Sequence, residues 1–229
     1  MRETWRSTLL NNIFKNNNLF SDEQLINKDV YQFGVFNGDS MREISNIMKN
    51  NNIAINNFNG YDVFSGMPKE TKEPIFQDSW DPDKEPDAFN VVKKFCLNNT
   101  EQVVEVIENS LYDFNNNYKY KIFNGLVEDT LPQSKSVIKP AFYVDIDLDI
   151  YSPSKFVLDY MLENKLITEG TLIGYDDWGG TPNFENYEFG ESRAHKEVCD
   201  KYNLTVKKIA QVGNTFPNVH NIWIIEKIG

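Results

Sequence analysis

The stretch that decides the fold is Ala141-Phe142-Tyr143-Val144-Asp145-Ile146-Asp147-Leu148-Asp149-Ile150-Tyr151-Ser152. Its first eight residues predict the strongest β-strand of the chain, and its apolar positions are typical of a strand in the centre of a sheet. Residues two apart share one face of a strand, so the three aspartates are expected on the same side. A helix is predicted directly after this strand, over 154–164.

The rest of the chain repeats this order of strand and helix. Further strands are predicted at 30–35, 53–58, 119–123 and 171–175, and helices around 41–48, 87–97, 100–112 and 191–202. The last two strands, 204–212 and 221–227, follow one another without a helix between them. Alternation predicts an α/β fold with a parallel sheet and helices on both faces, and the closing pair predicts an antiparallel edge.

The segments that precede the first strand and follow the second are candidates for covering elements. Apolar residues at helical spacing between 4 and 25 predict an N-terminal helix. We therefore expect residues 1–28 to form a helical extension or lid and residues 29–229 to form the main domain. The segment 66–86 is rich in proline and charge and is expected to be a long surface loop, a second possible lid.

Composition excludes several classes of function. The 229 residues carry 34 acidic and 23 basic side chains, and the net charge of −11 disfavours nucleic acid as a partner. The two cysteines, Cys96 and Cys199, are far apart and are expected to be buried rather than to form a zinc site or a disulfide. No stretch approaches about 18 apolar residues, so we expect a cytoplasmic protein with no membrane partner.

Ligands of open parallel sheets bind beyond the carboxyl ends of the strands. After the first strand, Gly34 and Gly38 lie in a strand-to-helix turn, where the backbone can approach a ligand closely and the helix start offers free N–H groups. A plain tight turn explains the same glycines equally well. Asp62 follows the second strand and is placed to accept hydrogen bonds from a ribose, although a solvated loop aspartate is the simpler interpretation of it alone.

Carboxylates follow two further strands. Asp145, Asp147 and Asp149 end the strongest strand, and the adjacent Asp176 and Asp177 end the next one. Three like charges beside apolar residues are costly without a cation or a solvated cleft, and the alternative is an exposed acidic strand face. Oxygen ligands without histidine or cysteine favour Mg²⁺ or Mn²⁺ over zinc.

Taken together, five motifs resemble the macrocin O-methyltransferase (TylF-like) family of class I S-adenosylmethionine-dependent methyltransferases. The resemblance extends from about residue 30 to residue 227, and the motifs occur in the family's order. They are Phe33-Gly34-Val35-Phe36-Asn37-Gly38-Asp39-Ser40, Tyr61-Asp62-Val63-Phe64-Ser65-Gly66-Met67-Pro68, Gly125-Leu126-Val127-Glu128-Asp129-Thr130-Leu131-Pro132, Asp147-Leu148-Asp149-Ile150-Tyr151-Ser152 and Tyr175-Asp176-Asp177-Trp178-Gly179.

The resemblance implies a seven-stranded Rossmann-like sheet whose last strand is antiparallel. It also implies methyl transfer from S-adenosylmethionine to a sugar hydroxyl, assisted by Mg²⁺ or Mn²⁺, with Asp149 as the general base. Gln32 stands where relatives usually carry glutamate, which keeps the hydrogen bonding and removes a charge. The residues implied to bind the cofactor are Gln32, Gly34, Gly38, Ser40, Asp62, Glu128 and Asp129, and those implied to bind the metal are Asp147, Asp176 and Asp177.

Two other functions compete with this one. The Asp-x-Asp pattern also occurs in metal-dependent glycosyltransferases, and a non-catalytic relative that only binds S-adenosylmethionine is the third possibility. A sugar of a glycan, of a polysaccharide under synthesis or of a nucleotide-linked precursor is the expected acceptor, and a homodimer is a fair expectation. We expect His195 to be exposed and His220 to be structural, and Trp178 either walls the acceptor pocket or packs in the core.

Overall fold

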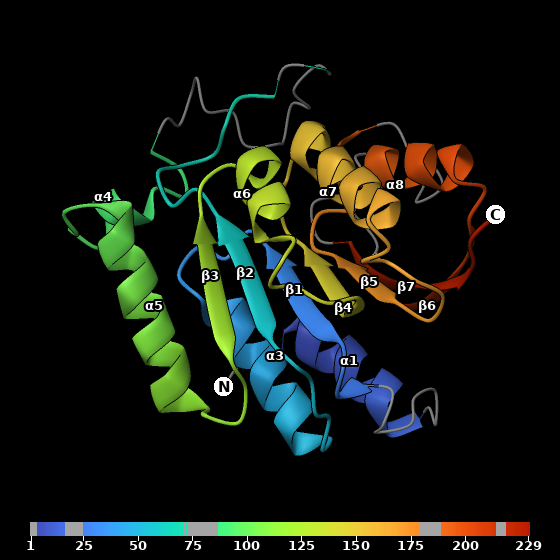
Figure 1. The fold of residues 1–229 in the computed structure, drawn as a ribbon, viewed down its shortest axis with the longest axis horizontal. Coiled ribbons are helices and arrows are strands. Elements are labelled where there is room, and N and C mark those ends of the chain that lie inside the picture. The colour runs from blue at the N-terminus through green and yellow to red at the C-terminus, as the bar shows by residue number, and fades with distance from the viewer. Residues whose placement is uncertain (1–3, 17–24, 71, 73–86, 179–188, 214–218) are drawn as a thin grey trace.

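The computed structural model describes residues 4–16, 25–70, 72, 87–178, 189–213 and 219–229. Seven strands form one sheet in the order β3-β2-β1-β4-β5-β7-β6 (Figure 1). The first five strands are parallel, and β7 is antiparallel to both of its neighbours. The strands are β1 (Asp29–Phe33), β2 (Phe58–Asp62), β3 (Tyr120–Asn124), β4 (Ala141–Ile146), β5 (Leu172–Tyr175), β6 (Thr205–Val212) and β7 (His220–Lys227).

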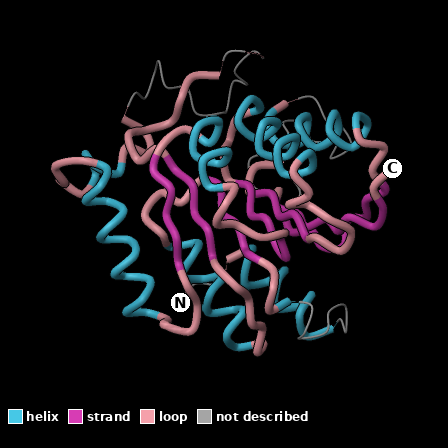
Figure 2. The backbone as a smooth tube through the Cα atoms, viewed as in Figure 1, coloured by secondary structure: helices cyan, strands magenta, loops and turns pink. Residues whose placement is uncertain are grey.

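Helices cover both faces of this sheet (Figures 1 and 2). One apolar core lies between the sheet and α6, α7 and α8, and a second lies between the sheet and α1, α3 and α5. The helices are α1 (Trp5–Asn16), α3 (Asp39–Asn50), α4 (Val91–Lys94), α5 (Thr100–Phe114), α6 (Val127–Ser134), α7 (Tyr151–Glu163) and α8 (Gly190–Lys201). The expected α/β fold with a Rossmann-like sheet, an antiparallel last strand and an N-terminal helix is confirmed.

The central strand β4 shows why the sequence folds in this way. All six of its residues are buried, because β1 and β5 flank it and helices cover both of its faces. Its parallel pairing with β1 aligns Gln32 with Asp145 and Phe33 with Ile146. Strand order reverses at this point, since the chain moves from β1 outward to β2 and β3 and then returns to β4 on the other side. Ligands of open α/β sheets bind at such a switch point.

Two local predictions were wrong. The second strand is Phe58–Asp62 rather than 53–58, because parallel pairing with β1 and β3 fixes its position despite the low β-propensity of Asn59 and Gly60. The cysteines are not buried either: Cys96 is exposed and Cys199 partly exposed. Of the expected helix over 4–25, residues 17–24 lie outside the described residues, as do 71 and 73–86 of the expected loop.

Candidate active site

The carboxyl ends of the central strands lie side by side. The parallel hydrogen-bond ladder continues one residue beyond each strand, so that Gly34, Asp147 and Asp176 form a row. The bonds that extend it are Gly34 N–H to Tyr61 O (2.9 Å), Asp147 N–H to Phe33 O (2.9 Å) and Asp176 N–H to Ile146 O (3.0 Å). The glycine turn and both aspartate motifs of the sequence therefore meet at one edge of the sheet.

Gly34 permits this close approach. Its φ of +88° lies in the left-handed region, and a Cβ at this position would lie 1.8 Å from the carbonyl oxygen of Asp147. No side chain fits at that distance. The glycine therefore brings the turn after β1 directly against the backbone that carries the first aspartate of the acidic cluster.

A cavity of about 290 Å³ opens at this edge. Its volume is near the lower end of the range for small-molecule pockets, roughly 300–1,000 Å³. The residues predicted to bind the cofactor that line it are Gly34, Ser40, Asp62 and Glu128, and its acidic end is lined by Asp147, Asp149 and Asp176. Gln32, Gly38 and Asp129 are not among its lining residues.

The side chains of Asp62 and Gln32 form hydrogen bonds with the backbone around this cavity. The Asp62 carboxylate accepts hydrogen bonds from the N–H groups of Phe36 (2.7 Å) and Phe64 (2.6 Å). Burial raises the pKa of Asp62, and these backbone bonds oppose the rise. The buried Gln32 donates from Nε2 to the Gly34 carbonyl at 3.3 Å, whereas its Oε1 has no partner among the described residues. Both side chains thus support the glycine turn.

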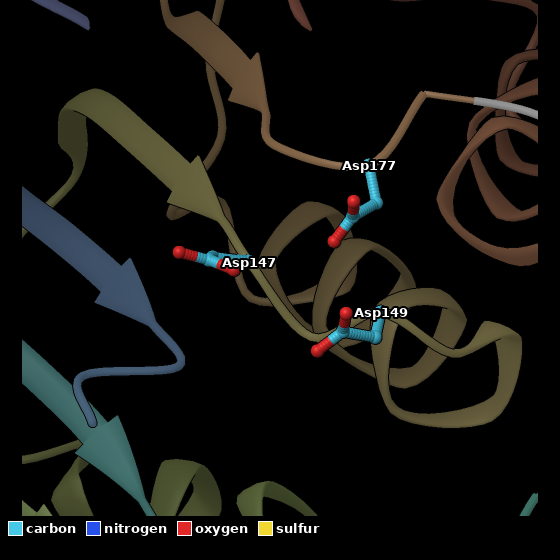
Figure 3. A group of neighbouring side chains, drawn as sticks. All are labelled: Asp147, Asp149 and Asp177. Atoms are coloured by element: carbon cyan, nitrogen blue, oxygen red, sulfur yellow. The ribbon is translucent and has the colours of Figure 1, made fainter. Parts of the chain in front are cut away.

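Three carboxylates lie near one another beyond the ends of β4 and β5 (Figure 3), and two of them, Asp147 and Asp149, line the cavity. Asp147, Asp149 and Asp177 each offer one oxygen, and these oxygens lie within 4.8 Å of one another; we call these residues the aspartate cluster. Burial and then the charge of Asp147 raise the pKa of Asp149 to about 8. Burial and the neighbouring carboxylates also raise the pKa values of Asp147 and Asp177. Three half-buried carboxylates with raised pKa values fit a hard divalent cation, which would offset their repulsion.

Asp176, the third residue predicted to bind the metal, is not a member of this cluster, although it shares the Arg6 ion pair with Asp147. It accepts a hydrogen bond from Trp5 Nε1 and lies 3.2 Å from the Arg6 guanidinium. Asp149, predicted as the base, joins Asp147 and Asp177 in its place. The two aspartate motifs therefore meet as expected, but the cluster contains Asp149 where Asp176 was predicted.

Sequence reasoning missed Arg6. This residue of α1 is 6% exposed and forms ion pairs with three carboxylates from β4 and β5 or their ends. The N···O distances are 2.9 Å to Asp145, 2.8 Å to Asp147 and 3.2 Å to Asp176. A single positive charge thus neutralises part of a strongly acidic region. One sequence offers no signal for this contact, because Arg6 and Asp145 are 139 positions apart.

Three ring side chains near the site were also given expected roles, and one of these expectations was wrong. His195 is buried and only 4% exposed, so the prediction of an exposed histidine was wrong. Its Nδ1 lies 2.9 Å from the Tyr175 hydroxyl, and its ring packs against Trp178 and Trp223. Trp178 is 1% exposed and packs in the core rather than lining the cavity. His220 stacks on Trp5 with ring centroids 5.1 Å apart.

No protein-family model matches the chain, and no curated protein is significantly similar in sequence. Within the described residues, none of the helices combines the length and the apolar character needed to span a bilayer.

Solved structures do match. The O-methyltransferase NovP aligns with a TM-score of 0.60 at 17% identity, covering 96% of this chain and 77% of NovP. The calicheamicin methyltransferase CalS11 aligns with a TM-score of 0.54 at 15% identity, covering 98% and 94%. An O-methyltransferase from Bacillus cereus in complex with SAH gives 0.52 at 12% identity, covering 87% and 74%. The chain thus has the fold found in these O-methyltransferases.

Proposed function

We propose that this protein is a metal-dependent O-methyltransferase that moves a methyl group from S-adenosylmethionine to a sugar hydroxyl. The observation that carries the proposal is one cavity lined both by the glycine turn after β1 and by Asp147 and Asp149 of the aspartate cluster. A donor bound by the turn and an acceptor held at the cluster would share this space. The fold shared with NovP and CalS11 supports the same conclusion.

The roles at the cofactor end come from the resemblance to the methyltransferase family, and the lining of the cavity supports four of them. Gly34 and Ser40 would hold the methionine part, Asp62 the ribose and Glu128 the adenine side. Gln32 and Gly38 would contribute to cofactor binding by setting the shape of the glycine turn. Asp129 is next to Glu128 in the first turn of α6 and would contribute by positioning the backbone beside the adenine. S-adenosylmethionine supplies an already activated methyl group, so the protein's task is alignment.

The aspartate cluster would bind Mg²⁺ or Mn²⁺ through Asp147, Asp177 and Asp149, with Asp176 beside it. A divalent cation lowers the pKa of a hydroxyl oxygen that it ligates. Asp149 is placed to take the hydroxyl proton, because it lines the cavity next to Asp147 and its carboxylate belongs to the same cluster. Helix α1 belongs to the N-terminal extension (residues 1–28) and brings Trp5 and Arg6 to the aspartates. The extension would then exclude water from the active site of the 29–229 domain.

A sugar is the acceptor class we favour. Two neighbouring hydroxyls suit a hard cation, and CalS11 is itself named a TDP-rhamnose 3'-O-methyltransferase. A glycan, a nucleotide-activated sugar and a glycosylated metabolite all carry such hydroxyls.

Calorimetry tests this proposal against the Asp-x-Asp glycosyltransferase. We expect S-adenosylmethionine and S-adenosylhomocysteine to bind. When nucleotide sugars are supplied with the metal but without S-adenosylmethionine, we expect none of them to be hydrolysed. Hydrolysis of a nucleotide sugar in the absence of any S-adenosylmethionine binding would favour the glycosyltransferase instead. A panel of free, nucleotide-linked and glycan-attached sugars, supplied with labelled S-adenosylmethionine, then identifies the acceptor.

A further inference from the structure

We propose that Glu191 is a positioning residue that holds the two segments of the aspartate cluster at the spacing needed for a cation. This inference rests on the proposed function and deepens it. Glu191 stands in the first turn of α8 and has 0% exposure, although the sequence presents it as part of a polar helix start. A carboxylate is almost never fully buried unless its oxygens are satisfied.

Each oxygen of Glu191 accepts a hydrogen bond from a different segment of the cluster. Oε1 accepts from the N–H of Leu148 at 3.0 Å, and Oε2 accepts from the N–H of Asp177 at 3.1 Å. Leu148 stands between Asp147 and Asp149 in the chain, and Asp177 is itself the third member of the cluster. One buried side chain therefore connects the backbone of both segments that supply the three carboxylates.

Asp149 gives this connection a specific task. Its φ of +61° is in the left-handed region, which a residue other than glycine adopts only where its surroundings impose it. The N–H of Ile150 donates to the Leu148 carbonyl across Asp149, so the chain turns tightly at this residue. Fixing the Leu148 N–H at the entrance of the turn fixes where the Asp149 carboxylate points.

The first turn of α8 lies directly against this turn. A Cβ at Gly190 would lie 3.2 Å from the Asp149 carbonyl oxygen, so the helix start packs against the Asp149 backbone. Among the described residues Glu191 makes no ion pair, and it accepts hydrogen bonds from the two backbone amides. A residue with only a packing role at this position needs no acceptor oxygens.

Glu191→Gln tests the inference with little change of volume. Glutamine keeps one oxygen for one amide but presents an NH₂ group to the other, so one of the two segments loses its acceptor. We expect the Kd for Mn²⁺, measured by calorimetry with S-adenosylhomocysteine present, to rise about 10–100-fold, the usual effect of removing a group that orients metal ligands. The Kd for S-adenosylhomocysteine itself should change by less than about 3-fold, because its pocket lies at the glycine turn.

Glu197→Gln is the matched control. Glu197 lies on the same helix, but its carboxylate binds the Tyr151 hydroxyl and Arg193 near the surface. We expect this variant to bind Mn²⁺ as the unaltered protein does. Equal Mn²⁺ affinity in both variants overturns the inference, and an equal loss of Mn²⁺ and S-adenosylhomocysteine in Glu191→Gln reduces Glu191 to a structural role.

A measurement on the unaltered chain does not depend on how the variant folds. Because one carboxylate binds both amides, we expect saturating Mg²⁺ to slow hydrogen exchange at Leu148 and Asp177 together. Protection at one amide without the other contradicts the inference. If the unaltered protein binds S-adenosylhomocysteine but no Mn²⁺, the metal part of the proposed function fails and the inference falls with it. If it binds both, the variants and the exchange rates decide.

Discussion

The guanidinium of Arg6 lies 2.8 Å from Oδ2 of Asp147, so the N-terminal helix contacts a carboxylate of the aspartate cluster directly. The same side chain pairs with Asp145, which is fully buried. Helix α1 is therefore part of the site's charge balance. Removing either partner of a buried pair leaves an uncompensated charge, which is more costly than the pair is stabilising.

Arg6→Met should lower the free energy of unfolding by about 3–5 kcal/mol, because Asp145 then lacks its cation. Adding Asp145→Asn to Arg6→Met should recover part of this loss by removing the unpaired charge. Lys93→Met is the surface control: it breaks the exposed pair with Asp87 and should change stability by about 1 kcal/mol or less. Urea denaturation measures all three variants, and a loss for Arg6→Met as small as that of the control contradicts the buried pairing.

Asp177→Asn and Asp176→Asn separate two adjacent carboxylates. Asp177 belongs to the aspartate cluster, whereas Asp176 is engaged by Trp5 and Arg6. We expect Asp177→Asn to weaken Mn²⁺ binding at least about 10-fold and Asp176→Asn to weaken it less. Calorimetric titration with Mn²⁺ checks this, and the reverse order would show that Asp176 is the ligand.

Gly34→Ala should be more damaging than Gly38→Ala. Both glycines have a similar positive φ, +88° and +80°, so the backbone strain is alike at about 1–3 kcal/mol. The added methyl meets the Asp147 backbone at 1.8 Å at Gly34 but only a side-chain methyl of Ile107, Cγ2, at 2.9 Å at Gly38. We expect Gly34→Ala to lose more stability to urea and to bind S-adenosylhomocysteine more weakly. Equal effects would mean that the close approach to Asp147 does not matter.

His195 should make the protein sensitive to acid. Burial lowers the pKa of His195 to about 3, whereas in the unfolded chain it is about 6.5. Below pH 6.5 the unfolded state therefore binds more protons, and stability falls as the pH falls toward 3. Over pH 6.5 to 5 this amounts to about 2 kcal/mol. His195→Phe should remove that dependence of stability on pH. It should also lower stability at every pH, because the Tyr175 hydroxyl loses its hydrogen-bond partner. Urea unfolding between pH 5 and 7 measures the slope, and an unchanged slope in the variant refutes the assignment.

Much of this fold could be predicted from the periodicity of apolar residues and from the polar residues at the strand ends. Alternating strands and helices predict the α/β sheet, and the positions of the two aspartate motifs at the carboxyl ends of neighbouring parallel strands predict that Asp147 and Asp177 lie at one edge. The position of β2 was missed because pairing with its neighbours, rather than the propensity of Asn59 and Gly60, fixes it.

Long-range contacts were beyond the sequence. Arg6 meets Asp145 from 139 positions away, and no pattern marks it among other surface-like arginines. Glu191 and His195 stand in a stretch that looks polar, yet backbone amides of two distant loops satisfy the first and aromatic rings from β5 and β7 enclose the second. Burial of a polar residue depends on partners that only the folded chain supplies.

Transfer of a labelled methyl group tests the central claim most directly. Labelled S-adenosylmethionine is incubated with the sugar panel in Mg²⁺ and in excess chelator, using the unaltered protein and Asp149→Asn. The account predicts a methylated sugar with Mg²⁺, its loss with chelator, and its loss in Asp149→Asn while S-adenosylhomocysteine still binds. Transfer that survives both the chelator and Asp149→Asn would contradict the account.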